Sequence, residues 1–157
     1  MGKFQVVIGR AEDVDLIEYA ANVPAKIDTG AFRSSIHATN IKVAKDGREA
    51  VLRCTLLGHP CHTKKYAFET KKFKQVTVTN SFGHEEKRYE VSIKIKLGPK
   101  VVMTSFTLAN RSKNLFPILI GRTLLKGRYV VDVSRASIDR KLLKKQASIK
   151  YDDEDLE

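Results

Sequence analysis

The stretch Ala25-Lys26-Ile27-Asp28-Thr29-Gly30-Ala31 decides the fold, and the rest of the chain can be arranged around it. Apolar residues alternate with exposed positions up to Ile27 and then give way to a carboxylate, a hydroxyl and a glycine. This pattern is typical of a strand that ends in a tight polar turn. Because Thr29 can bond the turn and Gly30 is free to adopt a positive φ, we expect backbone geometry to hold the Asp28 carboxylate. Taken alone, Asp-Thr-Gly is also a common ordinary turn.

A second segment far downstream, Phe116-Pro117-Ile118-Leu119-Ile120-Gly121-Arg122-Thr123-Leu124-Leu125, combines a short apolar strand, a glycine and an arginine that opens a leucine-rich helical turn. The two segments, in this order, resemble the retroviral-type aspartic peptidases, the retropepsins. In that family an Asp-Thr-Gly-Ala turn carries the catalytic aspartate, and an apolar-apolar-Gly-Arg segment packs beside it.

The longer patterns AKIDTGAFRSSIHA and FPILIGRTLLKGRYVVDVSR are similar to a bacterial and archaeal retropepsin-like branch found with ATP-grasp glutamate ligases. Some members of that branch carry the label "ATP-dependent zinc protease". The resemblance runs from about Val6 to about Arg135 and therefore covers most of the chain.

The remaining sequence predicts a mostly β protein. Hairpin signals lie at Asp46-Gly47 and at residues 80–84, each between segments of alternating apolar residues. Many short strands with little helix indicate an all-β, closed or partly closed barrel, which the resemblance makes a retropepsin-like acid protease barrel. Residues 12–21 fit a helix or a strand by periodicity, and the resemblance favours extended structure there.

The expected helices are few. A short helix should follow Gly121, and residues 134–146 carry Ile138, Leu142 and Leu143 at helical spacing among many lysines, which predicts a cationic helix with one apolar edge. We assign residues 1–135 to the retropepsin-like domain and residues 136–157 to this basic C-terminal helix and an acidic tail.

Composition places the chain among globular proteins, with 42% hydrophobic and 30% charged residues. We expect a cytoplasmic protein without membrane attachment, because no apolar run reaches the roughly 20 residues of a membrane span and the N-terminus does not have the layout of a signal peptide. Two cysteines, Cys54 and Cys61, fit reduced thiols better than a disulfide framework.

The formal charge of +11 is unevenly distributed. Residues 64–151 carry twenty-one basic and six acidic side chains, whereas residues 152–157 carry five acids. Such a field attracts polyanions, whether nucleic acid, ribosomal surface or acidic peptide, and it also serves simply as a solvated surface.

The resemblance implies peptide hydrolysis by a pair of carboxylates that share one proton, one acting as base toward water and the other as acid. The chain contains a single Asp-Thr-Gly turn, so it predicts a homodimer in which Asp28 of each copy meets at a two-fold axis. By the resemblance, Thr29 would hydrogen-bond across that axis, Gly30 would let the substrate backbone approach, and Ala31 would lie under the bound peptide.

The resemblance also assigns supporting residues. Gly121 and Arg122 would pack behind the Asp28 turn, and the hairpin tip Ser81-Phe82-Gly83 would form the flap that closes over the substrate. Viral enzymes place an acidic residue just after the Asp-Thr-Gly-Ala run as the partner of the helix arginine. Here Phe32 and Arg33 occupy those positions, so Arg122 must pair elsewhere or hold the dimer less tightly.

Two other functions compete with this interpretation. A zinc site is one, because Cys54, His59, Cys61 and His62 are close in sequence; their spacing does not match the usual zinc ligand pairs, so we expect no metal and no cofactor. A non-catalytic barrel that binds nucleic acid or a ribosomal surface is the other, since residues 64–74 interleave lysines with aromatic residues. Aromatic residues that alternate in a β protein are more often part of the core. These aromatic residues are Tyr66, Phe68 and Phe73.

The remaining predictions concern single histidines and the substrate. His37 is expected to be a hydrogen-bonded histidine beside the barrel, and His84 to lie on the surface near the flap tip. The link to glutamate ligases and the basic charge lead to the hypothesis that acidic or glutamylated protein tails are the substrate, with the lysine cluster at 71, 72 and 74 attracting them.

Overall fold

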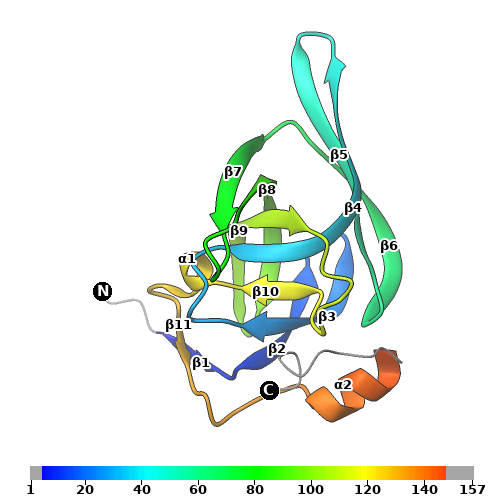
Figure 1. Cartoon of the computed structure of the whole chain (residues 1–157). Coiled ribbons are helices and arrows are strands. Elements are labelled where there is room, and N and C mark those ends of the chain that lie inside the picture. The colour runs from blue at the N-terminus through cyan, green and yellow to red at the C-terminus, as the bar shows by residue number, and fades with distance from the viewer. Residues whose placement is uncertain (1–4, 148–157) are drawn as a thin grey trace.

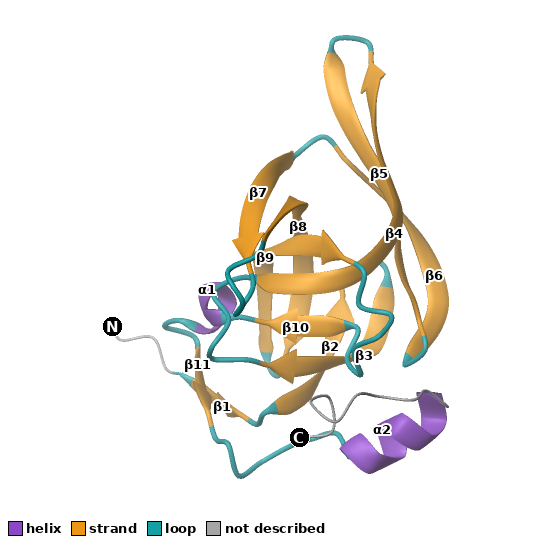
Figure 2. Cartoon of the chain, in the orientation of Figure 1, coloured by secondary structure: helices purple, strands orange, loops and turns teal. Residues whose placement is uncertain are grey.

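The computed structural model describes residues 5–147, and most of their regular structure is β. Figures 1 and 2 show a barrel from which a long hairpin projects, with short helices at its periphery. No helix in the described residues is long and apolar enough to cross a membrane. The elements are β1 (Val6–Ile8), β2 (Ala11–Leu16), β3 (Ala20–Ile27), β4 (Ser34–Asp46), β5 (Glu49–His59), β6 (His62–Thr70), β7 (Phe73–Thr79), β8 (Glu85–Leu97), β9 (Lys100–Ala109), β10 (Ile118–Ile120), α1 (Arg122–Leu125), β11 (Tyr129–Val131) and α2 (Arg140–Ala147).

Six strands close into a barrel in the order β10, β3, β2, β8, β9 and β4, and β4 pairs again with β10. The β10–β3 and β4–β9 pairs are parallel, whereas the other four are antiparallel, so the barrel is mixed. The prediction of a closed or partly closed barrel is therefore confirmed, and the barrel is closed. Residues 12–21 are extended apart from a turn at 17–19, and the helical alternative for them is wrong.

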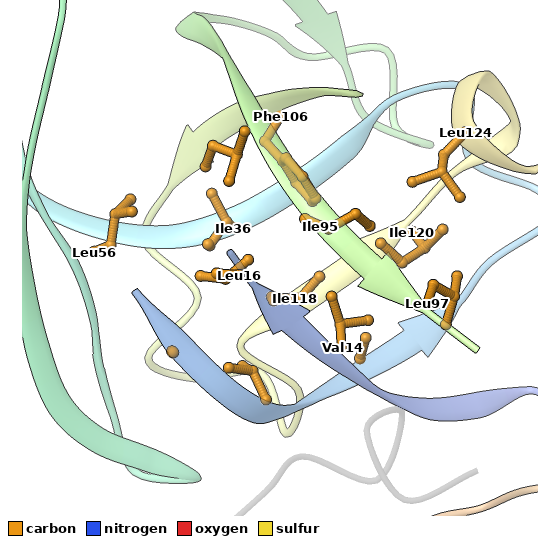
Figure 3. Packing of buried hydrophobic residues seen from close by; sticks show 14 of the residues in the cluster. Val14, Leu16, Ile36, Leu56, Ile95, Leu97, Phe106, Ile118, Ile120 and Leu124 are labelled. Atoms are coloured by element: carbon orange, nitrogen blue, oxygen red, sulfur yellow. The ribbon is translucent and has the colours of Figure 1, made fainter. Parts of the chain in front are cut away.

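One hydrophobic core fills the barrel because alternate residues of each strand point inward. Figure 3 shows side chains from β2, β4, β8, β9 and β10 meeting there. In β10 both Ile118 and Ile120 are fully buried, and burying each contributes about 2 kcal/mol relative to exposure. This burial holds β10 in the barrel wall and so positions Gly121, which directly follows it. The labelled core residues are Val14, Leu16, Ile36, Leu56, Ile95, Leu97, Phe106, Ile118, Ile120 and Leu124.

Two hairpins extend from the barrel at the predicted places. The β4–β5 hairpin turns at Gly47, which has a φ of 67°, and projects away from the barrel (Figure 1). The β7–β8 hairpin ends in an exposed turn in which Asn80 Oδ1 accepts hydrogen bonds from the N–H groups of Phe82 and His84, both at 2.9 Å. His84 is exposed on this turn, as predicted.

The C-terminal helix is shorter than predicted, because α2 begins at Arg140 rather than at residue 134. The preceding backbone is used in other ways: the N–H of Ser134 donates to Asp132 Oδ1, and that of Ser137 donates to the carbonyl of Ala11, both at 2.9 Å. Asp139 then caps the helix by accepting from the N–H of Lys141 at 2.9 Å.

Only part of the predicted apolar edge of this helix packs. Leu143 is buried against Ala11, Leu115 and Phe116, whereas Leu142 is 61% exposed. Residues 1–4 and the predicted acidic tail at 151–157 lie outside the described residues. The domain boundary at residue 135 stays a prediction.

Candidate active site

The Asp28 loop, residues 28–33, connects β3 to β4 and holds one half-buried carboxylate at the end of a barrel strand. The backbone N–H of Asp28 donates to the carbonyl of Ile120 in β10 at 2.9 Å. The N–H of Gly30 donates to Asp28 Oδ1, also at 2.9 Å. One bond therefore fixes the main chain of Asp28 and the other orients its carboxylate, so backbone geometry holds this group as expected.

The reason for a glycine at position 30 differs from the expected one. Gly30 does not adopt a positive φ. A Cβ atom there would instead lie 3.2 Å from Asp28 Oδ1, closer than most Cβ atoms come to any neighbour. A side chain at position 30 would therefore crowd the Asp28 carboxylate, which folds back toward the Gly30 backbone, and the expectation of a left-handed turn is wrong.

The Gly121–Arg122 segment packs directly behind the Asp28 loop. A Cβ atom on Gly121 would lie 2.6 Å from the carbonyl oxygen of Arg33 and 2.9 Å from that of Ala31, so no other residue fits without moving the loop. The N–H of Arg122 donates to the Ala31 carbonyl at 2.8 Å, and that of Thr123 donates to the Phe32 carbonyl at 3.1 Å. The start of α1 is thus bonded to the loop that carries Asp28.

Arg122 has partners other than an acidic residue. Its Nη1 donates to the carbonyl of Thr29 at 3.1 Å, and its guanidinium lies 5.9 Å from the centre of the Phe32 ring. Arg33 instead forms the ion pair of this region, at 2.5 Å from the buried carboxylate of Glu90 in β8. Arg122 therefore contacts a backbone carbonyl and an aromatic ring in place of the acidic partner expected from the viral enzymes. Arg33 pairs with Glu90.

A partly apolar hollow of about 700 Å³ adjoins the loop. Its lining includes Thr29, Phe32, Arg122, Leu125 and Tyr129. The Phe32 side chain is 57% exposed. This face of the molecule therefore presents the Asp28 loop together with apolar surface.

The structure brings six of the predicted site residues together. Asp28, Thr29, Gly30 and Ala31 lie in one loop against the Gly121–Arg122 segment. Within the described residues, the flap tip Ser81-Phe82-Gly83 forms no hydrogen bond with that loop, and Phe82 is 82% exposed.

The cysteines and histidines of the alternative zinc site point in different directions. Cys54 is buried in the barrel core, where burial raises the pKa of its thiol to about 11. His59 Nε2 donates to the carbonyls of Arg111 and Asn114, both at 2.8 Å, while Nδ1 accepts from the N–H of Cys61. Within the described part of the chain, no three His, Cys, Asp or Glu side chains are placed to hold a metal ion.

His37 belongs to a buried polar cluster that the sequence did not indicate. Its Nδ1 accepts from the N–H of Arg111 at 2.8 Å, and its ring packs edge-on against His59. Burial, with His59 and Arg111 nearby, lowers the pKa of His37 to about 4. Arg111 also donates to Ser35 Oγ and to the carbonyl of Phe116, so the cluster ties the 110–117 loop to the barrel.

The aromatic residues of 64–74 contribute to the core rather than to an exposed stacking surface. Phe68 is buried, with its ring 5.7 Å from that of Tyr19, and Tyr66 and Phe73 pack partly against the same core. Lys71 and Lys74 of the predicted acid-binding cluster lie near Glu49 and Glu90, at 2.8 and 3.6 Å. This region is consequently less cationic than its sequence suggests.

Sequence reasoning missed three residues of the site region. Ser34 is fully buried, and its Oγ accepts from the N–H of Gly121 at 3.0 Å. Glu90 in β8 supplies a buried carboxylate, and Arg111 in the 110–117 loop supplies a half-buried guanidinium. The only local signal is polar residues next to strongly apolar runs, and that signal does not identify partners.

Comparison with known proteins agrees with this geometry. Residues 7–142 match the RimB-like family, whose description is retropepsin-like aspartic endopeptidase RimB. The chain belongs to the RimB-like family.

The curated relatives of this RimB-like chain are longer proteins. Probable alpha-L-glutamate ligases from Shewanella pealeana and Shewanella halifaxensis are each 32% identical to it over 117 residues, which is 73% of this chain. One from Desulfotalea psychrophila is 32% identical over 114 residues, or 70% of the chain. The chain spans only about a quarter of the length of each of these ligases.

A solved structure gives the same fold for this RimB-like chain. The crystal structure of a DUF785 protein of unknown function from Legionella pneumophila is 32% identical, with a TM-score of 0.69. The likeness covers 85% of this chain and 97% of the Legionella chain. The mixed barrel is therefore shared with an experimentally determined relative.

Proposed function

We propose that the protein is an aspartic endopeptidase whose active form is a homodimer with one Asp28 from each copy. The observation that carries this proposal is the backbone-held, half-buried Asp28 carboxylate, packed against Gly121 and Arg122 at the mouth of a closed barrel. Membership in the RimB-like family of aspartic endopeptidases supports the same reaction.

The chemistry needs two carboxylates, and one chain supplies one at this loop. When two such groups lie within a few ångströms, they share a single proton because both cannot ionise together. The ionised Asp28 takes a proton from water as the oxygen attacks the peptide carbonyl, and the protonated Asp28 gives its proton to the carbonyl oxygen. Collapse of the tetrahedral intermediate breaks the C–N bond, and the leaving nitrogen receives a proton from the dyad.

The surface around Asp28 favours a second copy as its cover. Thr29 is exposed beside Asp28, and the 57% exposed ring of Phe32 lies next to the apolar hollow bounded by Leu125 and Tyr129. An isologous dimer places the same patch on both sides, so each Phe32 faces apolar surface of the other copy. In this arrangement Arg122 supports Thr29 from behind through its carbonyl.

We also propose that the substrate is acidic, such as a glutamylated protein tail. Relatives named probable alpha-L-glutamate ligases contain a segment like this chain, which links it to a ligase that acts with glutamate. The formal net charge of +11 attracts such a substrate. A peptidase and a glutamate ligase joined in this way would act in opposite directions on the same tails.

The deciding experiment compares Asp28→Asn with the wild-type protein in cleavage of a glutamate-rich peptide. We expect a loss of about a thousandfold or more, because the amide cannot act as a base. Asp46→Asn, in the exposed hairpin turn, is the matched control and should retain activity. A pepstatin-type inhibitor should slow cleavage, and a metal chelator should not.

The dimer is tested separately by sedimentation equilibrium and by activity on dilution. The rate per subunit should fall when the protein is diluted below the dimer dissociation constant, since a single Asp28 is inactive. A strictly monomeric active protein, or activity abolished by chelation, would overturn the proposal.

A further inference from the structure

A cationic groove of about 1100 Å³ runs between β3 and the segment that leads into α2. Figure 1 shows this segment passing from β11 beneath the barrel to α2. Phe116 and Ile138 supply apolar lining. We define the cationic groove by its basic lining residues, which are Arg10, Lys26, Arg140, Lys141 and Lys144.

The positive charge of the cationic groove is poorly balanced by acids. Asp139 is the one acidic residue in the described lining, and it accepts hydrogen bonds from backbone N–H groups at the start of α2. Lys26, Lys141 and Lys144 form no salt bridge with an acidic residue of the described chain. Three ammonium groups from two separate elements therefore share one hollow.

The cationic groove begins beside the Asp28 loop. Lys26 lies in β3 two residues before Asp28, which is about 7 Å along an extended strand. Lys26 pairs with Leu119 in β10, two residues before Gly121, and both line a smaller hollow that shares Phe116 with the cationic groove. The charged lining thus reaches the two segments that form the candidate active site.

We propose that the cationic groove binds acidic side chains of the substrate next to the bond that Asp28 hydrolyses. This inference rests on the proposed peptidase function and assigns its specificity to Lys26, Lys141 and Lys144. An extended peptide advances about 3.3 Å per residue, so successive glutamates reach cations on β3 and on α2. The lysine ammoniums bind carboxylates in many orientations, and the half-buried side chain of Ile138 offers apolar surface to glutamate methylenes.

The shape of the cationic groove favours an acidic peptide over single-stranded nucleic acid. Binding of single strands relies on exposed aromatic faces on which bases stack. The aromatic ring in this lining, Phe116, is 2% exposed and lies 5.7 Å from the Arg140 guanidinium. The groove therefore offers charge and aliphatic surface without a stacking platform.

Binding can be measured without catalysis in the full chain carrying Asp28→Asn. The probes are a fluorescent hexaglutamate peptide and a hexaglutamine peptide of equal length, followed by fluorescence anisotropy at low salt. Replacing Lys26, Lys141 and Lys144 together with Gln should weaken hexaglutamate binding about tenfold and leave the weak hexaglutamine binding unchanged.

The matched control replaces three exposed lysines elsewhere, Lys42, Lys45 and Lys94, with Gln. It removes the same charge and should change hexaglutamate affinity less than about twofold, because distant surface charges are screened. Equal weakening by both triple variants would overturn the proposal, since only net charge would then matter. An oligouridine that binds the groove as tightly as hexaglutamate would also overturn it, in favour of nucleic acid.

A second measurement uses the chain with Asp28 intact and a glutamate-rich substrate. The groove variant should raise KM with little change in kcat, whereas the control variant should change neither. If the wild-type protein binds hexaglutamate through these lysines but cleaves nothing, the peptidase proposal fails and the binding site stands. If it cleaves acidic and neutral peptides alike and the groove variant has unchanged KM, the groove assignment fails and the peptidase stands.

Discussion

The two ends of β10 use polar groups in opposite ways. At its C-terminal end, the Asp28 loop holds a half-buried carboxylate of which Oδ1 accepts one backbone N–H. At its N-terminal end, the loop over 110–117 is bonded through His37, His59 and Arg111, and the ring nitrogens of His59 both contact backbone groups.

This difference teaches how to separate chemistry from architecture in one fold. The cluster around His37 stabilises a loop because its buried polar atoms are bonded to backbone, which leaves little capacity for a ligand. Asp28 is oriented by backbone but stays accessible, as a reacting group must. The following predictions test that contrast, from the largest expected effect to the smallest.

Gly121→Ala should produce the largest loss of stability. The added Cβ atom meets the carbonyls of Arg33 and Ala31, which belong to the backbone and cannot rotate away. We expect the free energy of unfolding to fall by about 3 kcal/mol in urea titrations. Gly47→Ala is the control: its φ of 67° is strained but its surroundings are open, so about 1 kcal/mol should be lost. Equal losses would contradict the close packing at Gly121.

Acid should weaken the fold through the His37 cluster. Burial lowers the pKa of His37 to about 4 and also lowers that of His59, so the unfolded chain binds more protons below about pH 6.5. The stability supplied by neutral His37 is complete above pH 6.5 and is lost as the pH falls toward 4. When the pH is lowered from about 7.5 to about 5, the protonation equilibrium of His37 alone should reduce the free energy of unfolding by about 2 kcal/mol.

His37→Asn checks this assignment by urea unfolding at both pH values. Asparagine keeps an acceptor for the N–H of Arg111 but does not titrate. The pH dependence of the unfolding free energy should therefore become shallower by the contribution of one proton. An unchanged slope would show that other groups cause the acid sensitivity.

Ser34→Ala tests the hydrogen bond beneath the Asp28 loop. Its Oγ is the acceptor for the buried N–H of Gly121, and removing this oxygen leaves that donor unsatisfied. We expect the free energy of unfolding to fall by about 1.5 kcal/mol. Ser81→Ala in the exposed flap tip is the control and should change stability negligibly. A loss for Ser34→Ala no larger than for Ser81→Ala would mean that Gly121 finds another acceptor.

Arg122→Met should have the smallest effect on unfolding, about 0.5 kcal/mol, because the side chain is exposed and donates one bond to the Thr29 carbonyl. Arg128→Met is the matched control, since Arg128 Nη1 donates to the carbonyl of Leu124 at 3.0 Å. Under the proposed function, only Arg122→Met should weaken dimerisation in sedimentation experiments. Equal dimer affinities would remove Arg122 from the interface.

Much of the fold followed from local patterns. Asp46-Gly47 predicted the β4–β5 hairpin, and the turn signal at 80–84 between alternating segments predicted the β7–β8 hairpin. The C-terminal helix was predicted six residues too early because its apolar spacing continues through residues whose N–H groups bond elsewhere. Spacing reports periodicity, and it does not report which acceptor a backbone donor finds.

The sequence by itself determined a closed or partly closed barrel with one carboxylate at the end of β3, because strand alternation and turn chemistry act over a few neighbouring residues. Only the tertiary structure decided that Glu90 pairs with Arg33, that Ser34 bonds Gly121, and that α2 brings its lysines to Lys26. These partners are far apart in the chain and have no periodic signal. Their meeting depends on the register with which the barrel closes, and that register is set by the apolar core rather than by the polar groups themselves.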